Sequence, residues 1–506
     1  MLISTLITSL SSVDVLGNID VDIEGVAYNS NDVKDGFLFA AMKGERFDGH
    51  HFLRDACKKG AKAVVVKEFV KGLDGITQIR ATDTRDTLAR LSSVFYGEPS
   101  RRLRLIGVTG TNGKTSTAFI LESILKQAGR KTGIIGTIDY HFSGRRFKAA
   151  NTTPESLDLQ RLLHDMVENG VEDCIMEVSS HALTMKRVEG CTFEGAIFTN
   201  LSQDHLDFHG DMEGYFQAKA TLFKDILRKD SHRTPFSTIN IDDPKAEGLI
   251  SSDKTRMLTY GMDNGADIWP EEVSFSEDGI RGVLKTPAGS IRVISHLIGD
   301  FNLYNIMAAT GAGISLNIPI KVIETGIEVL KGVKGRMERL SSSRDGFDIV
   351  IDYAHTADAL EKVILSIRAF KKGRLITVFG CGGERDKGKR RVMGRVSAEG
   401  SDITILTSDN PRGEEPNGII KDIETGLKEM SIERLNTPPG SEIKGYMVNP
   451  DRREAIYLAI TMARDRDTVL IAGKGHEGYQ IIGKETIPFD DRIEAEKALE
   501  ERELWN

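Results

Sequence analysis

The sequence offers little that would build a cysteine-based site or a membrane segment. Its four cysteines, Cys57, Cys174, Cys191 and Cys381, form no CxxC pair. This spacing suggests neither a zinc site nor a disulfide framework. No apolar run approaches the roughly 20 residues of a membrane span. The N-terminus has no basic region followed by a small-residue cleavage pattern. We therefore expect a cytoplasmic protein that does not enter the membrane.

The chain also lacks an excess of basic residues. It has 67 Lys and Arg against 75 Asp and Glu, which gives a formal net charge of -8. This balance argues against a surface for nucleic acid or for an anionic membrane. Local basic pockets for phosphate groups are still compatible with it. We expect a monomer whose partners are small molecules.

The length and the alternation of elements predict a three-domain α/β protein. At 506 residues the chain is too long for one hydrophobic core. Turn-forming residues at 97–102 predict a linker after a small N-terminal α/β unit. Beyond it, apolar strand-like runs alternate with helical patterns, which predicts mainly parallel sheets with crossover helices. The expected domains are residues 1–100, 101–332 and 333–506.

The expected strands are short apolar runs. They lie at residues 37–41, 63–66, 105–108, 174–178, 196–199, 349–351, 375–379, 403–406 and 468–471. Helical periodicity covers residues 116–127, 157–167 and 215–227, and residues 282–294 predict an antiparallel hairpin. Ligands of open α/β sheets gather beyond the carboxyl ends of the strands, so the loops at those ends are the candidate sites.

One of these loops has the features of a nucleotide phosphate loop. GTNGKT at residues 110–115 follows an apolar strand and opens a helix. Glycines before a helix N-terminus leave backbone N–H groups free to bind a phosphate. Lys114 would reach the β- and γ-phosphates, and the Thr115 hydroxyl would bind Mg²⁺. The loop departs from the standard pattern, since Val108 stands at its first glycine, and a merely structural turn is the alternative.

Carboxylate and imidazole side chains follow two further strands. Glu177 ends one of them, and residues 199–207 (TNLSQDHLD) end another. A carboxylate beside a phosphate loop is well placed to bind Mg²⁺, although a capping or salt-bridging role is the simpler interpretation of Glu177 alone. His181 and His209 fit hydrogen-bonding loop residues as well as they fit ligands. Periodicity alone predicts that Lys219 is a solvated lysine on a helix.

Together the motifs resemble those of the Mur ligases of peptidoglycan synthesis. The matching segments keep the family order along nearly the whole chain and are GTNGKT at residues 110–115, EVSSHAL at 177–183, TNLSQDHLD at 199–207, NLYN at 302–305, GRME at 335–338, DYAHT at 352–356, FGCGGERD at 379–386 and AGKGHE at 472–477. The resemblance implies an ATP-dependent carbon–nitrogen ligase with a central P-loop ATPase-type sheet and a C-terminal Rossmann-like sheet. It is nearest to the branch of the family that adds the third residue of the stem peptide.

The resemblance also implies roles at the ATP end of the site. The implied ATP contacts come from the central and C-terminal domains and are Gly110, Thr111, Asn112, Gly113, Lys114, Thr115, Ser116, Asn305, Arg336, Asp352 and His355. Two Mg²⁺ ions would be held with the help of Thr115, Glu177, His205 and a carbamylated Lys219. The last role disagrees with the solvated lysine that periodicity predicts. Lys114, Lys219 and His205 are the implied catalytic residues.

The nucleotide-linked substrate would be UDP-N-acetylmuramoyl-L-alanyl-D-glutamate. The implied contacts are Ser30, Thr152, Thr153, Ser179 and Arg187. The family's Asp-Ser-Arg motif near the uridine is here Asn29-Ser30-Asn31, so only Ser30 carries over. Residues 44–50 still resemble the nucleotide-side loop of the family.

The incoming amino acid would be meso-diaminopimelate. The implied contacts are Arg385, Asp409, Asn410, Pro411, Arg412, Gly473 and Glu477. DNPR at residues 409–412 resembles the signature of enzymes that select meso-diaminopimelate over L-lysine. Diaminopimelate has a carboxylate that lysine lacks, and a guanidinium binds a carboxylate in a bidentate manner. The alternative is that Asn-Pro after a strand is simply a turn and that Arg412 is a surface charge.

The implied reaction has two steps. The γ-carboxylate of D-glutamate attacks the γ-phosphate of ATP, and the amine of the diamino acid then displaces phosphate from the acyl-phosphate. Lys114 and Mg²⁺ would offset the repulsion of like charges, and closure of the C-terminal domain would exclude water. The alternatives are the L-lysine-adding ligase of the same family, a folylpolyglutamate-synthetase-like ligase and a non-catalytic nucleotide-binding regulator.

Overall fold

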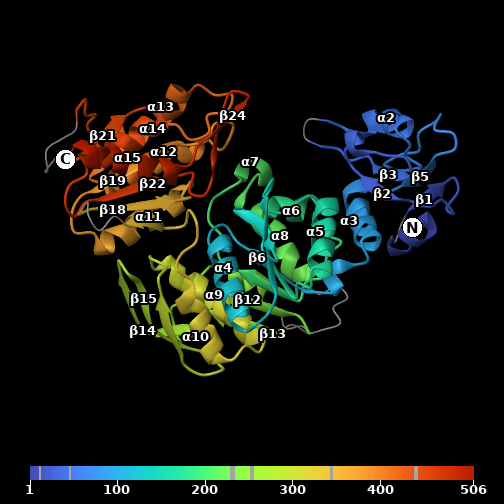
Figure 1. The fold of residues 1–506 in the computed structure, drawn as a ribbon, viewed down its shortest axis with the longest axis horizontal. Coiled ribbons are helices and arrows are strands. Elements are labelled where there is room, and N and C mark those ends of the chain that lie inside the picture. Colours follow the sequence, from blue (N-terminus) through green and yellow to red (C-terminus); the bar gives the residue numbers. More distant parts are fainter. Residues whose placement is uncertain are drawn as a thin grey trace.

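The computed structural model describes residues 1–10, 13–44, 47–227, 234–250, 256–341, 346–437 and 443–505. Three larger sheets follow one another along the chain (Figure 1). In that view the N-terminal sheet lies at the right, the C-terminal sheet at the upper left, and the central sheet between and below them. The expected α/β class with mainly parallel sheets is confirmed.

The N-terminal unit is a five-stranded sheet in the order β1-β5-β4-β3-β2. Its strands are β1 (Asp14–Leu16), β2 (Gly25–Ala27), β3 (Phe37–Ala40), β4 (Ala63–Val66) and β5 (Thr77–Arg80), and its helices are α1 (Ile3–Leu6), α2 (Leu53–Lys58) and α3 (Thr84–Phe95). Strands β2 to β5 are parallel, and β1 is antiparallel to β5. Asp83 begins α3, because its carboxylate accepts from the backbone N–H groups of Arg85 and Asp86.

The central sheet has eight strands in the order β13-β12-β11-β6-β10-β7-β8-β9. They are β6 (Arg104–Thr109), β7 (Thr132–Ile135), β8 (Asp139–Phe142), β9 (Arg145–Lys148), β10 (Asp173–Glu177), β11 (Gly195–Phe198), β12 (Phe236–Asn240) and β13 (Arg256–Tyr260). The helices are α4 (Lys114–Gln127), α5 (Ser156–Glu168), α6 (Ser180–Thr184), α7 (Leu206–His209), α8 (Met212–Thr221), α9 (Phe301–Ser315) and α10 (Ile320–Val329). The pairings of β8 with β7 and with β9 are antiparallel, and the other pairings of this sheet are parallel.

Both faces of the central sheet are covered, which explains why its strands are continuously apolar. Successive side chains of a strand point to opposite faces. Leu105 of β6 therefore packs with α5 and the π-helix η5 (Leu222–Ile226) that continues α8, whereas Ile106 packs with α4 and α9. The helix expected at residues 215–227 is the α8 and η5 pair. Strands β14 (Trp269–Ser276), β15 (Gly279–Lys285) and β16 (Ile291–Ser295) form a separate antiparallel sheet, and the pairing of β15 with β16 confirms the predicted hairpin.

The C-terminal sheet has six strands in the order β17-β18-β22-β19-β20-β21. They are β17 (Glu338–Ser341), β18 (Asp348–Asp352), β19 (Leu375–Phe379), β20 (Ile403–Leu406), β21 (Gly445–Val448) and β22 (Thr468–Ala472), all parallel except β17. The helices are α11 (Ala357–Phe370), α12 (Gly388–Gly400), α13 (Pro416–Glu429), α14 (Arg452–Met462) and α15 (Asp491–Trp505), and β23 (Tyr479–Ile482) pairs with β24 (Glu485–Pro488) in a small hairpin.

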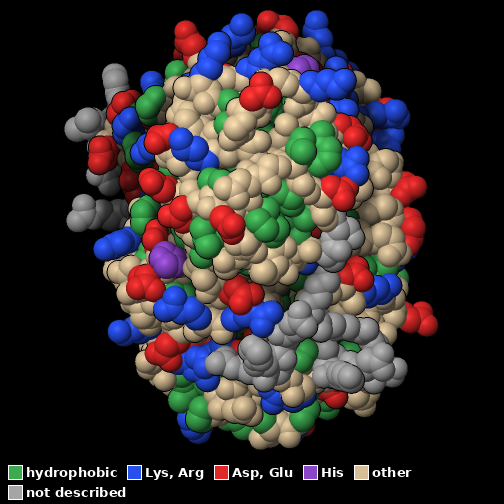
Figure 2. Space-filling view, turned by 90° about the vertical axis from the view of Figure 1, so that its right-hand side faces the viewer, with side chains coloured by type: hydrophobic (Ala, Val, Ile, Leu, Met, Phe, Trp, Pro, Cys, Tyr) green, Lys and Arg blue, Asp and Glu red, His purple; other side chains and the backbone are tan. Residues whose placement is uncertain are grey.

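The surface agrees with the balanced composition. On the face that Figure 2 shows, acidic and basic side chains are interspersed. Among the helices of the described residues, none combines the length and the apolar character that crossing a bilayer requires.

Candidate active site

The predicted phosphate loop lies between β6 and α4, as expected. Gly110 and Gly113 have φ angles of 148° and 87°. A Cβ on Gly110 would lie 1.9 Å from Thr199 Oγ1, and one on Gly113 would lie 2.3 Å from Asn305 Oδ1. Side chains are therefore excluded at both positions by backbone conformation and by space. Thr111 N donates to Asn200 O at 2.8 Å, so the loop is held by the residues that follow β11.

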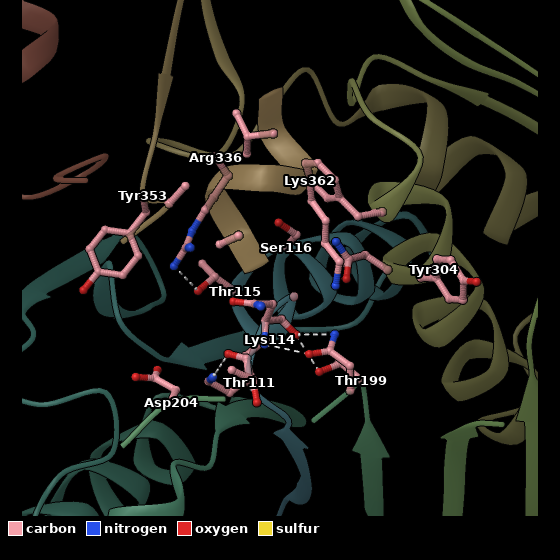
Figure 3. A pocket seen from close by; sticks show the side chains of 18 of the residues that line it. Thr111, Lys114, Thr115, Ser116, Thr199, Asp204, Tyr304, Arg336, Tyr353 and Lys362 are labelled. Carbon is pink, nitrogen blue, oxygen red and sulfur yellow. Dashed lines mark hydrogen bonds between the residues drawn. The ribbon is translucent and has the colours of Figure 1, made fainter. Parts of the chain in front are cut away.

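Lys114 and Thr115 lie at the start of α4 (Figure 3). The Lys114 ammonium donates to the carbonyls of Gly110 and Thr111, each at 2.8 Å. Burial lowers the pKa of Lys114, and the nearby Glu177 carboxylate opposes that shift. Thr115 Oγ1 donates to Glu177 Oε2 at 3.0 Å. Ser116 follows in the same turn and also lines the cavity above the loop.

Glu177 ends β10 and is buried beside the loop. Its carboxylate also accepts from the backbone N–H of Thr137 at 2.9 Å and from Thr137 Oγ1 at 2.8 Å. Glu177 therefore braces the turn after β7 and faces the phosphate loop at the same time. Thr137 was not identified from the sequence, because its role depends on a strand pairing between distant segments.

His205 lies beyond β11 with a positive φ of 54° and begins α7. It lines the same cavity as Thr115 and Glu177 and pairs with Asp204, with 3.3 Å between Nε2 and Oδ2. The His181 ring centroid lies 4.7 Å from that of His205 and 5.5 Å from that of His209. Burial lowers the pKa of each of these three histidines to about 4. They are neutral imidazoles at neutral pH.

Lys219 is not the solvated lysine that periodicity predicts. Its side chain is 1% exposed, and its ammonium donates to Gly110 O at 2.8 Å from behind the phosphate loop. It lies 4.5 Å from the centroid of the Tyr215 ring. Burial, and then the charge of Lys114, lower the pKa of Lys219 well below its ordinary value. The solvated-lysine prediction is wrong because α8 packs this face against the phosphate loop.

The C-terminal sheet reaches over the phosphate loop. Arg336 Nη2 donates to Thr115 Oγ1 at 3.0 Å, and its guanidinium lies 4.6 Å from the Tyr353 ring centroid (Figure 3). The buried Asp352 carboxylate accepts from the backbone N–H groups of Met337 and Ala354, each at 2.7 Å. Burial raises the pKa of Asp352. His355 Nδ1 lies 2.9 Å from Tyr353 O, and burial followed by the charge of Lys389 lowers its pKa.

Two cavities adjoin each other, and the first is lined by the phosphate loop. The first, of about 480 Å³, lies above Lys114 and is closed on the far side by Phe301 and Tyr304. The second, of about 530 Å³, opens toward the loops after β19, β20 and β22. Residues that line both cavities are Thr137, Thr152, Asp204, His205, Tyr353 and His355. A group held in the first cavity can therefore meet a group held in the second.

The second cavity contains most of the predicted amino-acid contacts. Arg385, Asp409, Asn410, Arg412, Gly473 and Glu477 line it, whereas Pro411 is buried beneath the loop. Arg412 Nη1 donates to Gly383 O at 2.9 Å. Asn410 Nδ2 and the fully buried Lys474 both donate to Glu477 Oε2 at 3.0 Å. Arg412 is half-buried and anchored, so it is not a free surface charge.

The predicted contacts of the nucleotide-linked substrate fall into two groups. Thr152, Thr153, Ser179 and Arg187 cluster near Glu177: Thr153 Oγ1 donates to Glu177 O at 2.8 Å, and Arg187 Nη1 donates to Thr153 O at 3.0 Å. Arg187 also pairs with Glu155, which contacts Arg85 of the N-terminal unit.

Ser30 lies apart from this group, in the N-terminal sheet, where Lys59 Nζ donates to Ser30 O at 3.0 Å. The side chain of Asn29 accepts from Asn31 N at 3.0 Å, so the altered motif still forms a local turn. The loop expected at residues 44–50 falls partly outside the described residues.

Comparisons with known proteins identify the family of this chain. Residues 22–96 match the model "Mur ligase family, catalytic domain", residues 108–313 "Mur ligase middle domain", and residues 335–475 "Mur ligase, glutamate ligase domain". Two relatives are named UDP-N-acetylmuramoyl-L-alanyl-D-glutamate--2,6-diaminopimelate ligase. The one from Geobacter metallireducens is 44% identical over 491 residues and covers 96% of each chain. The one from Gloeobacter violaceus is 46% identical over 484 residues and covers 96% of this chain and 95% of its own.

A solved structure of a protein with the same name is 32% identical, covers 95% of each chain and has a TM-score of 0.67. The chain belongs to the Mur ligase family, whose members form amide bonds at the expense of ATP.

Proposed function

We propose that this chain adds meso-diaminopimelate to the γ-carboxylate of UDP-N-acetylmuramoyl-L-alanyl-D-glutamate, with ATP as co-substrate, in peptidoglycan precursor synthesis. The observation that carries the proposal is the anchored Arg412 in a cavity that adjoins the one above the phosphate loop. The domains proposed are residues 1–100 for the UDP end, 101–332 for ATP and 333–506 for the amino acid. A monomeric state and a cytoplasmic location stay predictions.

The first step joins the glutamate γ-carboxylate to the γ-phosphorus, with ADP as the leaving group. Lys114 starts α4 where the helix N-terminus also favours negative charge, so both offset the repulsion between carboxylate and phosphate. Thr152, Thr153, Ser179 and Arg187 would hold the muramyl-peptide at the edge of the first cavity. The remaining ATP contacts would come from both units: Asn305 from the central unit, and Arg336, Asp352 and His355 from the C-terminal unit.

In the second step the amine nitrogen attacks the acyl carbonyl carbon, loses a proton and expels phosphate. The cavities share a boundary at Asp204, His205 and His355, so the amine can approach the acyl-phosphate there without leaving the protein. Overlap of the C-terminal loops with the phosphate loop supports exclusion of water, which would otherwise hydrolyse the intermediate.

Mg²⁺ fits the residues beside the phosphate loop. The Thr115 hydroxyl and the Glu177 carboxylate are adjacent, and both are oxygen ligands of the kind that Mg²⁺ prefers. No group of three or more His, Cys, Asp or Glu side chains in the described part of the chain is arranged to hold a metal alone. Mg²⁺ is commonly held by one or two carboxylates together with substrate phosphates, so Thr115 and Glu177 would suffice with ATP, and His205 would add a contact. When bound, Mg²⁺ would neutralise phosphate charge.

Carbamylation of Lys219 is the second part of the metal proposal. Lys114 and Lys219 both donate to Gly110 O, so two ammonium groups lie close together in a buried environment. The lowered pKa of Lys219 favours a neutral amine, which is the form that adds to CO₂. The carbamate would be an anion, so it would remove the like-charge repulsion, and its oxygens would help to hold Mg²⁺.

The amino-acid end supports diaminopimelate over lysine. Arg412 would bind the carboxylate that lysine lacks, and Glu477 would accept from an ammonium group. The cavity wall between Arg412 and Glu477 would be formed by Asp409, Asn410 and Gly473. The L-lysine-adding ligase is the second candidate, but a lysine side chain would leave the Arg412 guanidinium without a partner in this cavity.

The test is phosphate release from ATP by the purified chain with UDP-N-acetylmuramoyl-L-alanyl-D-glutamate and either amino acid. We expect release that depends on the muramyl-peptide and is much faster with meso-diaminopimelate than with L-lysine. Equal rates with the two amino acids would contradict the proposed specificity. ATP binding without turnover in either mixture would favour a regulator.

A further inference from the structure

A carboxylate of the C-terminal unit accepts hydrogen bonds from the phosphate loop and from the loop that follows β11. Asp358 lies in the first turn of α11, and its Oδ2 accepts from Asn112 Nδ2 at 2.8 Å and from Ser202 Oγ at 3.0 Å. Asn112 belongs to the phosphate loop, and Ser202 to the loop that follows β11. Asp358 lines neither cavity, so its contacts with the central unit are made to protein alone.

The contact fixes the side chain of Asn112. The Asn112 backbone is already held, because its N–H donates to Asn200 Oδ1 at 2.9 Å and its carbonyl accepts from Thr199 Oγ1 at 2.6 Å. The side-chain amide has Asp358 Oδ2 as its short partner and Ser202 Oγ as a longer one at 3.3 Å. Removal of the carboxylate would therefore leave the amide with its longer partner alone, without disturbing the loop backbone.

The contact also fixes the loop that carries two predicted ATP contacts. Asp352 and His355 lie just before α11, and Thr356 Oγ1 begins the helix by accepting from Ala359 N at 3.3 Å. A tie at Asp358 thus limits where Asp352 and His355 can lie above the phosphate loop. Another contact between the units, Arg336 to Thr115, involves two residues that are themselves predicted to contact ATP or Mg²⁺. Farther along α11, Ser366 Oγ donates to Asp300 Oδ1 at 3.1 Å.

We propose that Asp358 is a positioning residue that fastens the C-terminal sheet to the phosphate loop through Asn112 and Ser202. The proposal rests on the ATP site proposed above and adds a residue that acts through Asn112. If the sheet moves away, Asp358 keeps Lys362, which lies one turn along α11 at 3.0 Å, and loses both donors of the central unit. The two hydrogen bonds therefore favour only the arrangement in which the sheets meet.

The consequence is a link between domain position and ATP affinity. ATP contacts come from both units, so ATP binds better when the units meet. A ligand's apparent affinity falls with the fraction of protein in the competent arrangement. Loss of charge-assisted hydrogen bonds of this kind would lower that fraction about tenfold. The contacts of the nucleotide-linked substrate, which lie on the N-terminal and central units, would be affected less.

The experiment compares Asp358→Ala, Asp358→Asn and Glu361→Ala with the wild type. Glu361→Ala removes the same charge from an exposed position of the same helix and is the matched control. We expect the KM for ATP to rise about tenfold in Asp358→Ala while the KM for the muramyl-peptide stays unchanged. Asp358→Asn, which keeps an acceptor oxygen, should recover part of the loss, and Glu361→Ala should behave as the wild type.

A second readout does not depend on turnover. Small-angle X-ray scattering with Mg²⁺ and adenylyl methylenediphosphonate should show compaction of the wild type that is reduced in Asp358→Ala, with thermal melting unchanged. Ser202→Ala should weaken analogue binding in the wild type but have little further effect in Asp358→Ala.

Equal compaction and equal analogue affinity in wild type and Asp358→Ala would overturn the proposal, as would strictly additive effects of Ser202→Ala and Asp358→Ala. A wild type that neither binds the analogue nor releases phosphate would instead overturn the proposed function, and this inference with it.

Discussion

The nucleotide end and the amino-acid end of the site are built in different ways. At the nucleotide end, one contiguous segment supplies the phosphate loop, and glycines at 110 and 113 with positive φ leave no room for side chains. At the amino-acid end, long charged side chains from loops far apart in the sequence meet in one cavity. The first end depends on backbone conformation, and the second depends on how charged side chains are anchored.

The anchoring of the amino-acid end is done by buried ion pairs. Arg452 and Asp491 are both fully buried, 2.7 Å apart, and Arg452 Nη2 also donates to Ala472 O at the start of the loop that carries Gly473. Lys474, fully buried as well, holds Glu477. Such pairs contribute little net stability but fix geometry. This difference implies that separate mutations can impair phosphate transfer from ATP and selection of the amino acid.

The largest effect is expected from Lys114→Ala at the nucleotide end. The variant loses the cation that would bind the transferred phosphate. Removal of one such electrostatic contact typically lowers kcat by about 10²- to 10³-fold. We expect phosphate release to fall by about 10³-fold or more with either amino acid, and the fold to persist. Steady-state phosphate release with circular dichroism as a control checks this. Near-normal turnover would remove Lys114 from the mechanism.

The next effect is expected from Arg412→Ala at the amino-acid end. Truncation of one member of a buried charge pair costs on the order of 2–5 kcal/mol. At about 1.4 kcal/mol per tenfold, kcat/KM for diaminopimelate should fall roughly 30- to several-thousand-fold. The low activity with lysine should change little.

Arg412→Lys is the matched control for this change. It should recover only part of the activity, because a point charge lacks the planar fork of the guanidinium. An unchanged preference in Arg412→Ala would mean that residues 409–412 are only a turn.

A smaller effect, of about 100-fold, is expected from Lys219→Arg. Arginine keeps a positive charge but stays protonated, so it cannot form a carbamate. Lys224→Arg, an exposed lysine close by on η5, is the matched control and should be silent. Native mass spectrometry of the folded protein near neutral pH should show one added CO₂ on the active wild type. An unmodified Lys219 in a fully active preparation would contradict the carbamate.

Local sequence was enough to predict the phosphate loop and most strands. The strands at residues 105–108, 174–178 and 196–199 are buried on both faces, so their apolar runs are continuous and the loops beyond them stand out. Lys219 was different. Its helix shows no pattern that marks one lysine as buried, and only the packing of α8 behind the phosphate loop places it there.

Contacts between the domains could not be predicted from local sequence patterns. Asp358 occupies the first turn of a helix, where an acidic residue is ordinary, and nothing in the sequence indicates that it reaches Asn112 across the units. Thr137 escaped notice because its contact with Glu177 depends on the pairing of β7 with β10. Lys474 escaped notice because no local pattern marks it as buried. The family resemblance implied roles for some residues of the motifs but none for Asp358, Thr137 or Lys474.

The separation of the two ends is tested most directly by positional isotope exchange in ATP. Reversible formation of the acyl-phosphate moves label from the β,γ-bridge of ATP to non-bridging positions, and it needs the muramyl-peptide but no amino acid. The account predicts exchange at the wild-type rate in Arg412→Ala and none in Lys114→Ala. Loss of exchange in Arg412→Ala, or its persistence in Lys114→Ala, would contradict the account.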